Sequence, residues 1–123
     1  MISLILLILG GIFSACVDVL RFRWNTSIFR NWPNQLWVNP NFSWRNKWKD
    51  GDPEKGEKFL GSSTIFVWLT DFWHLCKFIM ILLFVGSIVF YNPMIVWWLD
   101  IIILYCSFTI IFELFFSIIL VKK

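Results

Sequence analysis

Charged residues are scarce in this chain, and their scarcity excludes the largest class of proteins. Of 123 residues only 15% are Asp, Glu, Lys or Arg, whereas 59% are apolar and the mean hydropathy is +0.71. A soluble domain has about 25% charged residues. The composition therefore excludes an ordinary cytosolic enzyme, a secreted disulfide scaffold and a disordered tail, and it predicts a membrane protein.

Residue types that carry common chemistries are also few. The sequence has one histidine, His74, which cannot supply bis-histidine haem ligation within one chain, and it has no P-loop, nucleophile elbow or HExxH motif. Its three cysteines, Cys16, Cys76 and Cys106, form no CxxC pair, and each lies in an apolar run. We expect all three to be buried small hydrophobic residues, and we expect no cofactor.

Three apolar segments are long enough to cross a bilayer, which takes ~20 helical residues. They cover residues 2–20, about 72–91 and 94–121. The fold is thus predicted to be all-α, a single membrane domain over residues 1–123 with a Trp-rich interfacial loop between the first and second spans. Phe13–Cys16 is close to a lipoprotein cleavage pattern, but no basic region follows Met1, so we expect the first segment to remain a span.

Asn92-Pro93 is the only break between the second and third spans. It predicts a tight hairpin in which these two helices are antiparallel neighbours.

Basic residues predict how the chain is threaded. Eight of the eleven Lys and Arg residues lie between Arg21 and Lys58, and two more, Lys122 and Lys123, end the sequence. With three spans both basic regions fall on one side, which the positive-inside rule makes cytoplasmic. We therefore expect an inner-membrane protein with its N-terminus outside and its C-terminus in the cytoplasm.

The loop of residues 21–66 alternates Trp with Asn and basic residues. Its Pro and Gly residues prevent a long helix, so we expect an ordered loop with one or two short helical turns at the membrane interface. Two Trp four positions apart would share one face of a helical turn, with cations near them. The pattern predicts membrane anchoring, and also binding of anionic lipid headgroups rather than nucleic acid. The headgroup candidates are Trp44, Arg45, Lys47, Trp48 and Lys49.

Asp50–Glu54 has the composition of a turn. It also matches half of a calcium-binding loop, but the remaining ligand spacing is missing.

Motifs in and after this loop form one distinctive series. They read NPNFSWRNKWK over residues 39–49, GDP over 51–53, GSST over 61–64 and LTD over 69–71, followed by Trp73-His74. The series resembles an uncharacterised family of small membrane proteins encoded by bacteria and their phages. The resemblance implies a natural membrane protein without an assigned activity, and it carries over no catalytic residue.

Ionisable residues inside membrane spans are costly unless they are paired, so each is a functional candidate. At 100° per residue, polar stripes on the second and third spans lie at matching depth. They predict an ion pair between Lys77 and Glu113 and a hydrogen bond from His74 to Asp18 or Asp71. A purely structural role stays open, in which Lys77 extends to the headgroups. The predicted polar cluster at the cytoplasmic end comprises Asp18, Asp71, His74, Lys77 and Glu113.

Asp100 lies apart from these residues, in the outer part of the third span. We expect an interfacial residue that is hydrogen-bonded near Trp97 or Trp98, two members of the outer aromatic belt.

Function is predicted to be interaction rather than catalysis. Three short helices enclose little interior, so we expect a homo-oligomer or a part of a larger membrane complex, in a pore, regulator or immunity-type role. Gly10-Gly11, Ser14-Ala15 and Gly86-Ser87 provide small surfaces on which other helices could pack.

The alternative is a metal-assisted enzyme that acts on lipid headgroups at the cytoplasmic leaflet. Its catalytic candidates are Asp71, His74 and Glu113, and its candidate metal ligands are Asp18, Asp71 and His74. Such oxygen-rich ligation suits Mg²⁺, Mn²⁺ or Fe²⁺. No recognised motif joins these residues.

Overall fold

The computed structural model describes residues 1–121, and three helices within them are long and apolar enough to cross a bilayer. They are α1 (Ile2–Phe22), α4 (Phe72–Val89) and α5 (Trp97–Leu114), and α5 continues into the π-helical segment η7 (Phe115–Ile119). The prediction of an all-α, three-span membrane protein with a Trp-rich connection is confirmed. Lys122 and Lys123, which contributed to the predicted orientation, lie outside the described residues.

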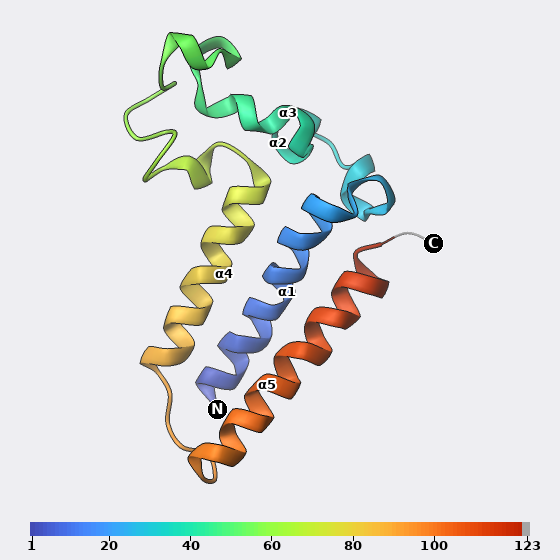
Figure 1. The fold of residues 1–123 in the computed structure, drawn as a ribbon, viewed down its shortest axis with the longest axis vertical. Coiled ribbons are helices and arrows are strands. Elements are labelled where there is room, and N and C mark those ends of the chain that lie inside the picture. Colours follow the sequence, from blue (N-terminus) through green and yellow to red (C-terminus); the bar gives the residue numbers. More distant parts are fainter. Residues whose placement is uncertain (122–123) are drawn as a thin grey trace.

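The three long helices form a row with α1 in the middle (Figure 1). Helix α1 packs against both α4 and α5, and α4 and α5 touch each other where the rings of Phe84 and Phe108 lie 5.7 Å apart. The second and third spans are therefore antiparallel and in contact at these rings, but the predicted tight hairpin between them is wrong. The connection between them is seven residues, 90–96, rather than a two-residue turn. At ~3.3 Å per residue it spans ~20 Å, enough to pass the end of α1 when helices lie 8–10 Å apart.

Two adjacent glycines explain why α1 takes the central place. A Cβ on Gly10 would lie 2.6 Å from the ring of Phe84 on α4, and one on Gly11 would lie 3.3 Å from the ring of Phe108 on α5. Small residues let helix backbones approach closely in a membrane. Because neighbouring residues point ~100° apart on a helix, Gly10 receives α4 and Gly11 receives α5, and the Phe84 and Phe108 rings meet each other at 5.7 Å. These small surfaces are occupied within the chain.

The polypeptide between the first two long helices folds into a headpiece, defined here as residues 23–71. Its short elements are η1 (Trp24–Thr26), η2 (Ile28–Asn31), α2 (Gln35–Val38), α3 (Pro40–Ser43), η3 (Trp44–Lys47), η4 (Lys49–Gly51), η5 (Pro53–Lys55) and η6 (Val67–Leu69). These are more turns than the one or two predicted. Pro40 and Pro53 each begin a turn at its first position, where proline is tolerated, and Gly56 at φ 84° ends the second.

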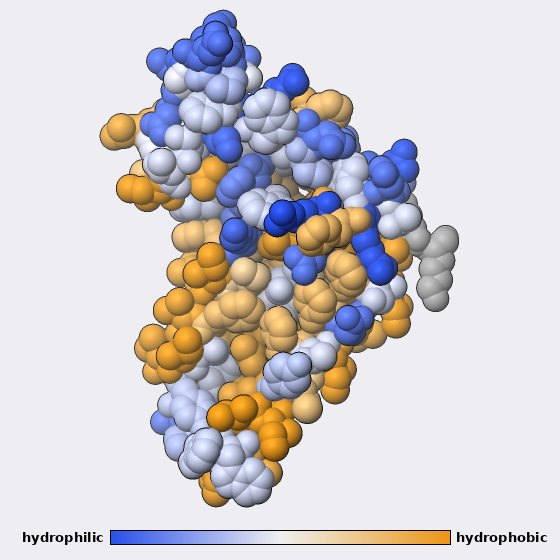
Figure 2. Space-filling view, in the orientation of Figure 1, coloured by the Kyte–Doolittle hydropathy of each residue, from blue (hydrophilic) through white to orange (hydrophobic). Residues whose placement is uncertain are grey.

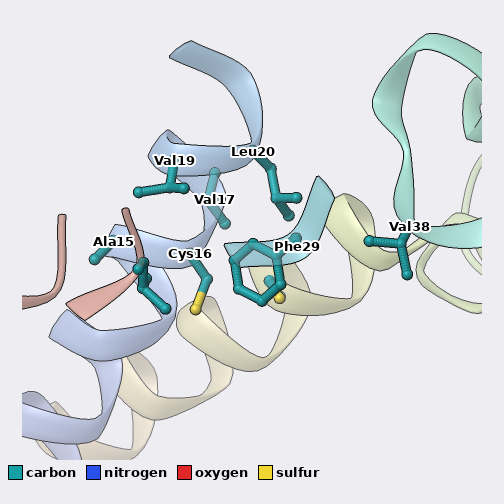
Figure 3. Packing of buried hydrophobic residues seen from close by; sticks show 9 residues of the cluster. Ala15, Cys16, Val17, Val19, Leu20, Phe29 and Val38 are labelled. Atoms are coloured by element: carbon teal, nitrogen blue, oxygen red, sulfur yellow. The ribbon is translucent and has the colours of Figure 1, made fainter. Parts of the chain in front are cut away.

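The apolar core lies where the headpiece meets the long helices. Phe29 is the largest fully buried side chain, and it is 2% exposed. Figure 3 shows Phe29 beside Cys16 and Leu20 of α1, with Val38 on the headpiece side. The ring of Phe72, in the first turn of α4, lies 5.3 Å from that of Phe29. This junction fixes the headpiece relative to α1 and α4.

The polarity of the molecular surface changes at this same junction. Hydrophobic residues cover most of the long helices on the face seen in Figure 2, and hydrophilic residues gather on the headpiece. The C-terminal end of the described chain returns to the headpiece, where the backbone amide of Ile28 donates to the carbonyl of Leu120 at 3.0 Å. The row therefore has a headpiece end and, around residues 90–96, a turn end.

Candidate functional site

An acid–imidazole pair stands at the N-terminus of α4. Asp71 is the N-cap residue, and its Oδ1 accepts a hydrogen bond from the backbone amide of His74 at 2.7 Å. Asp is among the preferred N-cap residues because its carboxylate satisfies such free amides. The other oxygen, Oδ2, lies 2.7 Å from Nδ1 of His74. Of the two acids predicted as partners of His74, Asp71 is the one that the fold provides.

This pairing leaves one imidazole nitrogen for other contacts. The Asp71 side chain is 3% exposed and that of His74 is 27% exposed. The ring of Trp73 meets the imidazole edge to face, with 4.8 Å between centroids. Because Nδ1 is held by the carboxylate, Nε2 is the nitrogen available to a ligand. A buried acid that orients a partly exposed imidazole is an arrangement used in both binding and acid–base chemistry.

A cavity of about 450 Å³ opens beside the pair, where α1 ends and α4 begins. Its volume lies within the 300–1,000 Å³ range of small-molecule sites. Three indole rings and one guanidinium group contribute to the wall, together with the acid–imidazole pair. The lining residues are Leu20, Arg21, Trp24, Pro40, Asn41, Ser43, Trp44, Asp71, Trp73 and His74.

Hydrogen bonds of the headpiece hold the wall of this cavity in place. Nδ2 of Asn46 donates to the carbonyl oxygens of Leu36 at 2.7 Å and Thr70 at 2.9 Å, so that one side chain ties two headpiece segments to the start of α4. Nε1 of Trp44 donates to the carbonyl of Asn41 at 3.1 Å. The cavity is therefore built by residues far apart in the sequence.

Arg21 is the cation of the cavity wall. It is exposed, its guanidinium carbon lies 5.2 Å from the centre of the Phe22 ring, and it makes no ion pair within residues 1–121. Arginine binds carboxylates and phosphates through a planar set of donors. Such a group next to indole rings suits a ligand with a negative head and an apolar remainder.

The five headgroup candidates do not form one surface. The helical turn that was to carry both indoles is a 3₁₀ turn that ends at Lys47, and Trp48 is extended (φ −110°, ψ 150°) and bridges to Glu57. Trp44 lines the cavity, whereas Trp48 is half-buried on another side of the turn. The cations do lie close to the indoles. Arg45 is 5.1 Å from the Trp44 ring centre, and Lys47 is 5.8 Å from the Trp48 ring centre. Lys49 is exposed beyond this turn.

The predicted polar cluster is only partly assembled. Asp71 and His74 meet, and Nζ of Lys77 lies one turn further on, 4.9 Å from the centre of the Trp73 ring. Glu113 is on α5, across α1, and its Oε2 accepts a hydrogen bond from Ser117 at 3.1 Å. The predicted Lys77–Glu113 ion pair is absent from the described part of the chain, because α1 separates the two helices.

Candidate metal ligands are not gathered either. Residues 1–121 contain no group of three or more His, Cys, Asp or Glu side chains placed to hold a metal ion. The half-buried Asp18 lies on α1 and does not join the Asp71–His74 pair. In the acidic turn, Oδ1 of Asp52 accepts from the Glu54 amide at 3.0 Å and Asp50 pairs with Lys55 at 3.3 Å. That turn is held by its own hydrogen bonds.

The cysteines follow the prediction in two of three positions. Cys16 on α1 and Cys76 on α4 are buried in the core at the headpiece end. Cys106 is exposed, on the part of α5 that faces away from α1. It occupies an apolar run, but the row of helices leaves that face without a neighbour.

Glu57 is a structural residue that the sequence reasoning did not select. Its carboxylate accepts hydrogen bonds from the Ser63 hydroxyl and, at 3.1 Å, from the Gly61 amide. The Ser63 hydroxyl, and to a smaller degree the Gly61 amide, hold the pKa of Glu57 below its usual range. Ser62 completes the turn by donating to the carbonyl of Lys47 at 2.7 Å. The GSST motif was therefore a signal for this turn.

Asp100 is buried at the start of α5. It is 1% exposed, and its hydrogen bonds come from Tyr91 and from the backbone just before Trp97. Oδ2 accepts from the Tyr91 hydroxyl at 2.6 Å and from the Met94 amide at 2.9 Å, and Oδ1 accepts from the Ile95 amide at 3.1 Å. The carboxylate thus organises the connection before α5.

Comparisons with known proteins give no family, relative or fold neighbour: no protein-family model, curated protein or solved structure matches the chain.

Proposed function

We propose that this protein acts by binding, and that the cavity at the headpiece end holds the anionic headgroup of a membrane lipid. The observation that carries the proposal is the combination of Arg21, the Asp71–His74 pair and three indoles in one cavity of about 450 Å³. That cavity lies where apolar helices give way to a polar headpiece, the level at which headgroups reside.

The proposed orientation places the headpiece in the cytoplasm of a bacterium, with the N-terminus and residues 90–96 outside. Eight of the eleven Lys and Arg residues lie between Arg21 and Lys58, and the connection of residues 90–96 has none. The positive-inside rule supports this assignment. Anionic lipids of the cytoplasmic leaflet attract such residues by about 1 kcal/mol each.

The chemistry of the cavity favours a phosphate-bearing head with acyl chains. Arg21 provides a guanidinium, and His74, whose Nδ1 is held by Asp71, provides its Nε2 for a polar contact with the ligand. Trp24, Trp44 and Trp73 supply aromatic surface for the glycerol and upper acyl region. The one carboxylate in the wall, on Asp71, is turned to His74 by two hydrogen bonds and does not oppose an anion alone.

A lipid-binding measurement tests the proposal. The protein in nanodiscs of phosphatidylcholine is titrated with short-chain phosphatidylglycerol, phosphatidylcholine or inorganic phosphate, and binding is read from Trp fluorescence and native mass spectrometry. We expect saturable binding of phosphatidylglycerol, and Arg21→Gln should weaken it about tenfold, equivalent to the loss of one charge-assisted contact of roughly 1.4 kcal/mol.

The matched control is Arg23→Gln. Arg23 lies two positions from Arg21, but its guanidinium stands 4.4 Å from the Phe116 ring centre and does not line the cavity. We expect this variant to bind like the unaltered protein. Equal weakening by both variants would reduce the effect to surface charge and contradict a specific site. Binding of inorganic phosphate alone with equal affinity would assign the cavity to a soluble anion.

A second function, an enzyme acting on lipid headgroups, is favoured by the Asp71–His74 hydrogen bond. With Nδ1 held by the carboxylate, Nε2 can accept a proton from a nucleophile in the cavity. Incubation with phosphatidylglycerol, with and without Mg²⁺, Mn²⁺ or Fe²⁺, followed by mass spectrometry of the lipid, tests it. Turnover that His74→Gln abolishes while lipid binding persists would favour this function. Unchanged lipid under all conditions would favour binding alone.

A further inference from the structure

Each of the two outer membrane-spanning helices carries one exposed charged side chain in the described part of the chain. Lys77 on α4 and Glu113 on α5 are both exposed, and neither makes an ion pair within the described chain. Lys77 has the Trp73 ring at 4.9 Å, and Glu113 has the Ser117 hydroxyl at 3.1 Å. An ionised group inside the bilayer is costly by at least ~2.5 kcal/mol when nothing compensates it.

The two side chains stand at similar depth in the bilayer. The contacts of Gly10 with Phe84 and of Gly11 with Phe108 give a common level on the two sides of α1. Lys77 precedes Phe84 by seven residues and Glu113 follows Phe108 by five, and both displacements run towards the headpiece end. At 1.5 Å per residue, the displacements are ~10 and ~8 Å. The charges therefore match in height although α1 keeps them apart.

On α5, Glu113 belongs to a polar stripe that faces away from the rest of the molecule. Phe108, Ile111 and Phe112 meet α1 or the core, whereas the opposite side of the helix exposes Cys106, Thr109 and Glu113. Their spacing of three and four residues places them on one face. The Thr109 hydroxyl donates to the Tyr105 carbonyl at 2.9 Å, so Glu113 is the group on this face that a polar partner in the membrane would stabilise.

On α4, Lys77 lines a groove. A cavity of about 300 Å³ runs between α4 and the segment before it, and its wall is mainly apolar and includes Ile65, Trp68, Lys77, Phe78 and Ile81. The Trp68 and Phe78 rings stack at 4.4 Å and fix one side of it. The groove thus places Lys77 among mainly apolar side chains, with His74 also on its wall, and it complements a helix face that carries a single acid.

We propose that copies of this chain assemble side by side, with α5 of one copy packed against α4 of the next and Glu113 paired with Lys77 of the next copy. Each copy then uses its two outer helices in two different contacts, a head-to-tail arrangement that closes into a ring when the rotation allows. All copies keep the same orientation in the membrane, since α5 and α4 run antiparallel and the paired charges have equal depth. The groove shares His74 with the wall of the lipid cavity, whereas Lys77, the residue that the proposed contact uses, does not line that cavity.

Charge reversal tests the pairing in the full-length protein. Oligomer size is measured in nanodiscs and mild detergent by native mass spectrometry and single-molecule photobleaching. We expect Glu113→Lys and Lys77→Glu each to weaken association at least about tenfold, and the double variant to regain most of it. Glu54→Lys, an exchange at an exposed headpiece position outside both surfaces, is the matched control and should leave association unchanged.

A mixing experiment separates this arrangement from a symmetric one. When Glu113→Lys and Lys77→Glu copies carry different labels, a head-to-tail contact joins the introduced lysine on α5 of one variant to the introduced glutamate on α4 of the other. Mixed pairs then form where neither variant associates alone. Helical circular dichroism checks that each variant is folded, and Glu113→Gln with Lys77→Met repeats the test without reversed charge. A monomeric unaltered protein, additive losses in the double variant, or association through α5 alone would overturn the proposal.

Discussion

The acidic side chains at the two ends of the helical row differ in burial and in their hydrogen-bond partners. At the turn end, Asp100 is buried and receives three hydrogen bonds from Tyr91 and two backbone amides. At the headpiece end, Asp71 orients His74 towards a cavity, and Glu113 faces outwards with one hydroxyl as its partner. A satisfied carboxylate fixes the fold, whereas groups with spare hydrogen-bonding capacity can recognise something else. The headpiece end is therefore where we place the proposed binding site.

The largest expected effect concerns the satisfied acid. Asp100→Ala removes the acceptor of three hydrogen bonds and should lower the free energy of unfolding by on the order of 3 kcal/mol. Reversible unfolding in detergent micelles, followed by Trp fluorescence, measures the loss. Asp100→Asn retains one oxygen acceptor and should lose less. If Asp100→Ala unfolded with the same free energy as the unaltered protein, the contrast between the two ends would disappear.

A smaller effect is expected at the centre of the row. Gly10→Ala places a Cβ 2.6 Å from the Phe84 ring and should destabilise the α1–α4 contact by about 1–3 kcal/mol through overpacking. Gly86→Ala on the same interface is the matched control, because its Cβ would meet only a Leu6 methyl at 3.3 Å. Unfolding in micelles should rank Gly10→Ala as the more damaging change. The reverse order would show that α1 does not pack on α4 in this register.

A third comparison concerns the tie between the headpiece and α4. Asn46→Ala removes two hydrogen bonds, each worth about 1 kcal/mol, and should loosen the cavity wall. Hydrogen exchange should then accelerate in residues 44–48 and at the start of α4, while the turn end keeps its protection. Asn41→Ala is the control, since Asn41 is exposed and its side chain is not part of this tie. Uniform acceleration along the chain would indicate global destabilisation instead.

The smallest effect is a pH dependence in the turn around Glu57. Because its folded pKa is lowered, the carboxylate contributes stability that is complete above the unfolded value of about 4.3 and is lost as pH falls through the folded value. Backbone NMR signals of residues 57–63 should therefore move between pH 5 and acid conditions while the cavity stays intact. Glu57→Gln should abolish that local titration, and Glu54→Gln should leave it. A titration that survives Glu57→Gln would belong to another group.

The Trp-rich motifs show which features of the headpiece the local sequence pattern predicts. Residues 39–71 contain Asn, Pro, Gly and Ser at positions that the structure explains as caps and ties, such as Asn39 accepting from the Asn41 amide at 2.9 Å. The sequence indicated an ordered, proline-interrupted loop, and Asp71 and His74 were candidates because they are ionisable residues at the start of a predicted span. The cavity was not predictable, because Arg21, Trp44 and His74 come together only through Asn46 and the core around Phe29.

Composition and hydropathy by themselves determined that three helices cross the membrane, since a long apolar run must satisfy its backbone internally. The order of those helices in space was decided by tertiary packing. Gly10 receives Phe84 of α4 and Gly11 receives Phe108 of α5, and residues 90–96 are long enough to pass the end of α1. Helical phase predicts which residues share a face but not which helix that face meets. Lys77 and Glu113 are therefore matched in depth, as the sequence indicates, yet they stand on opposite edges of the row.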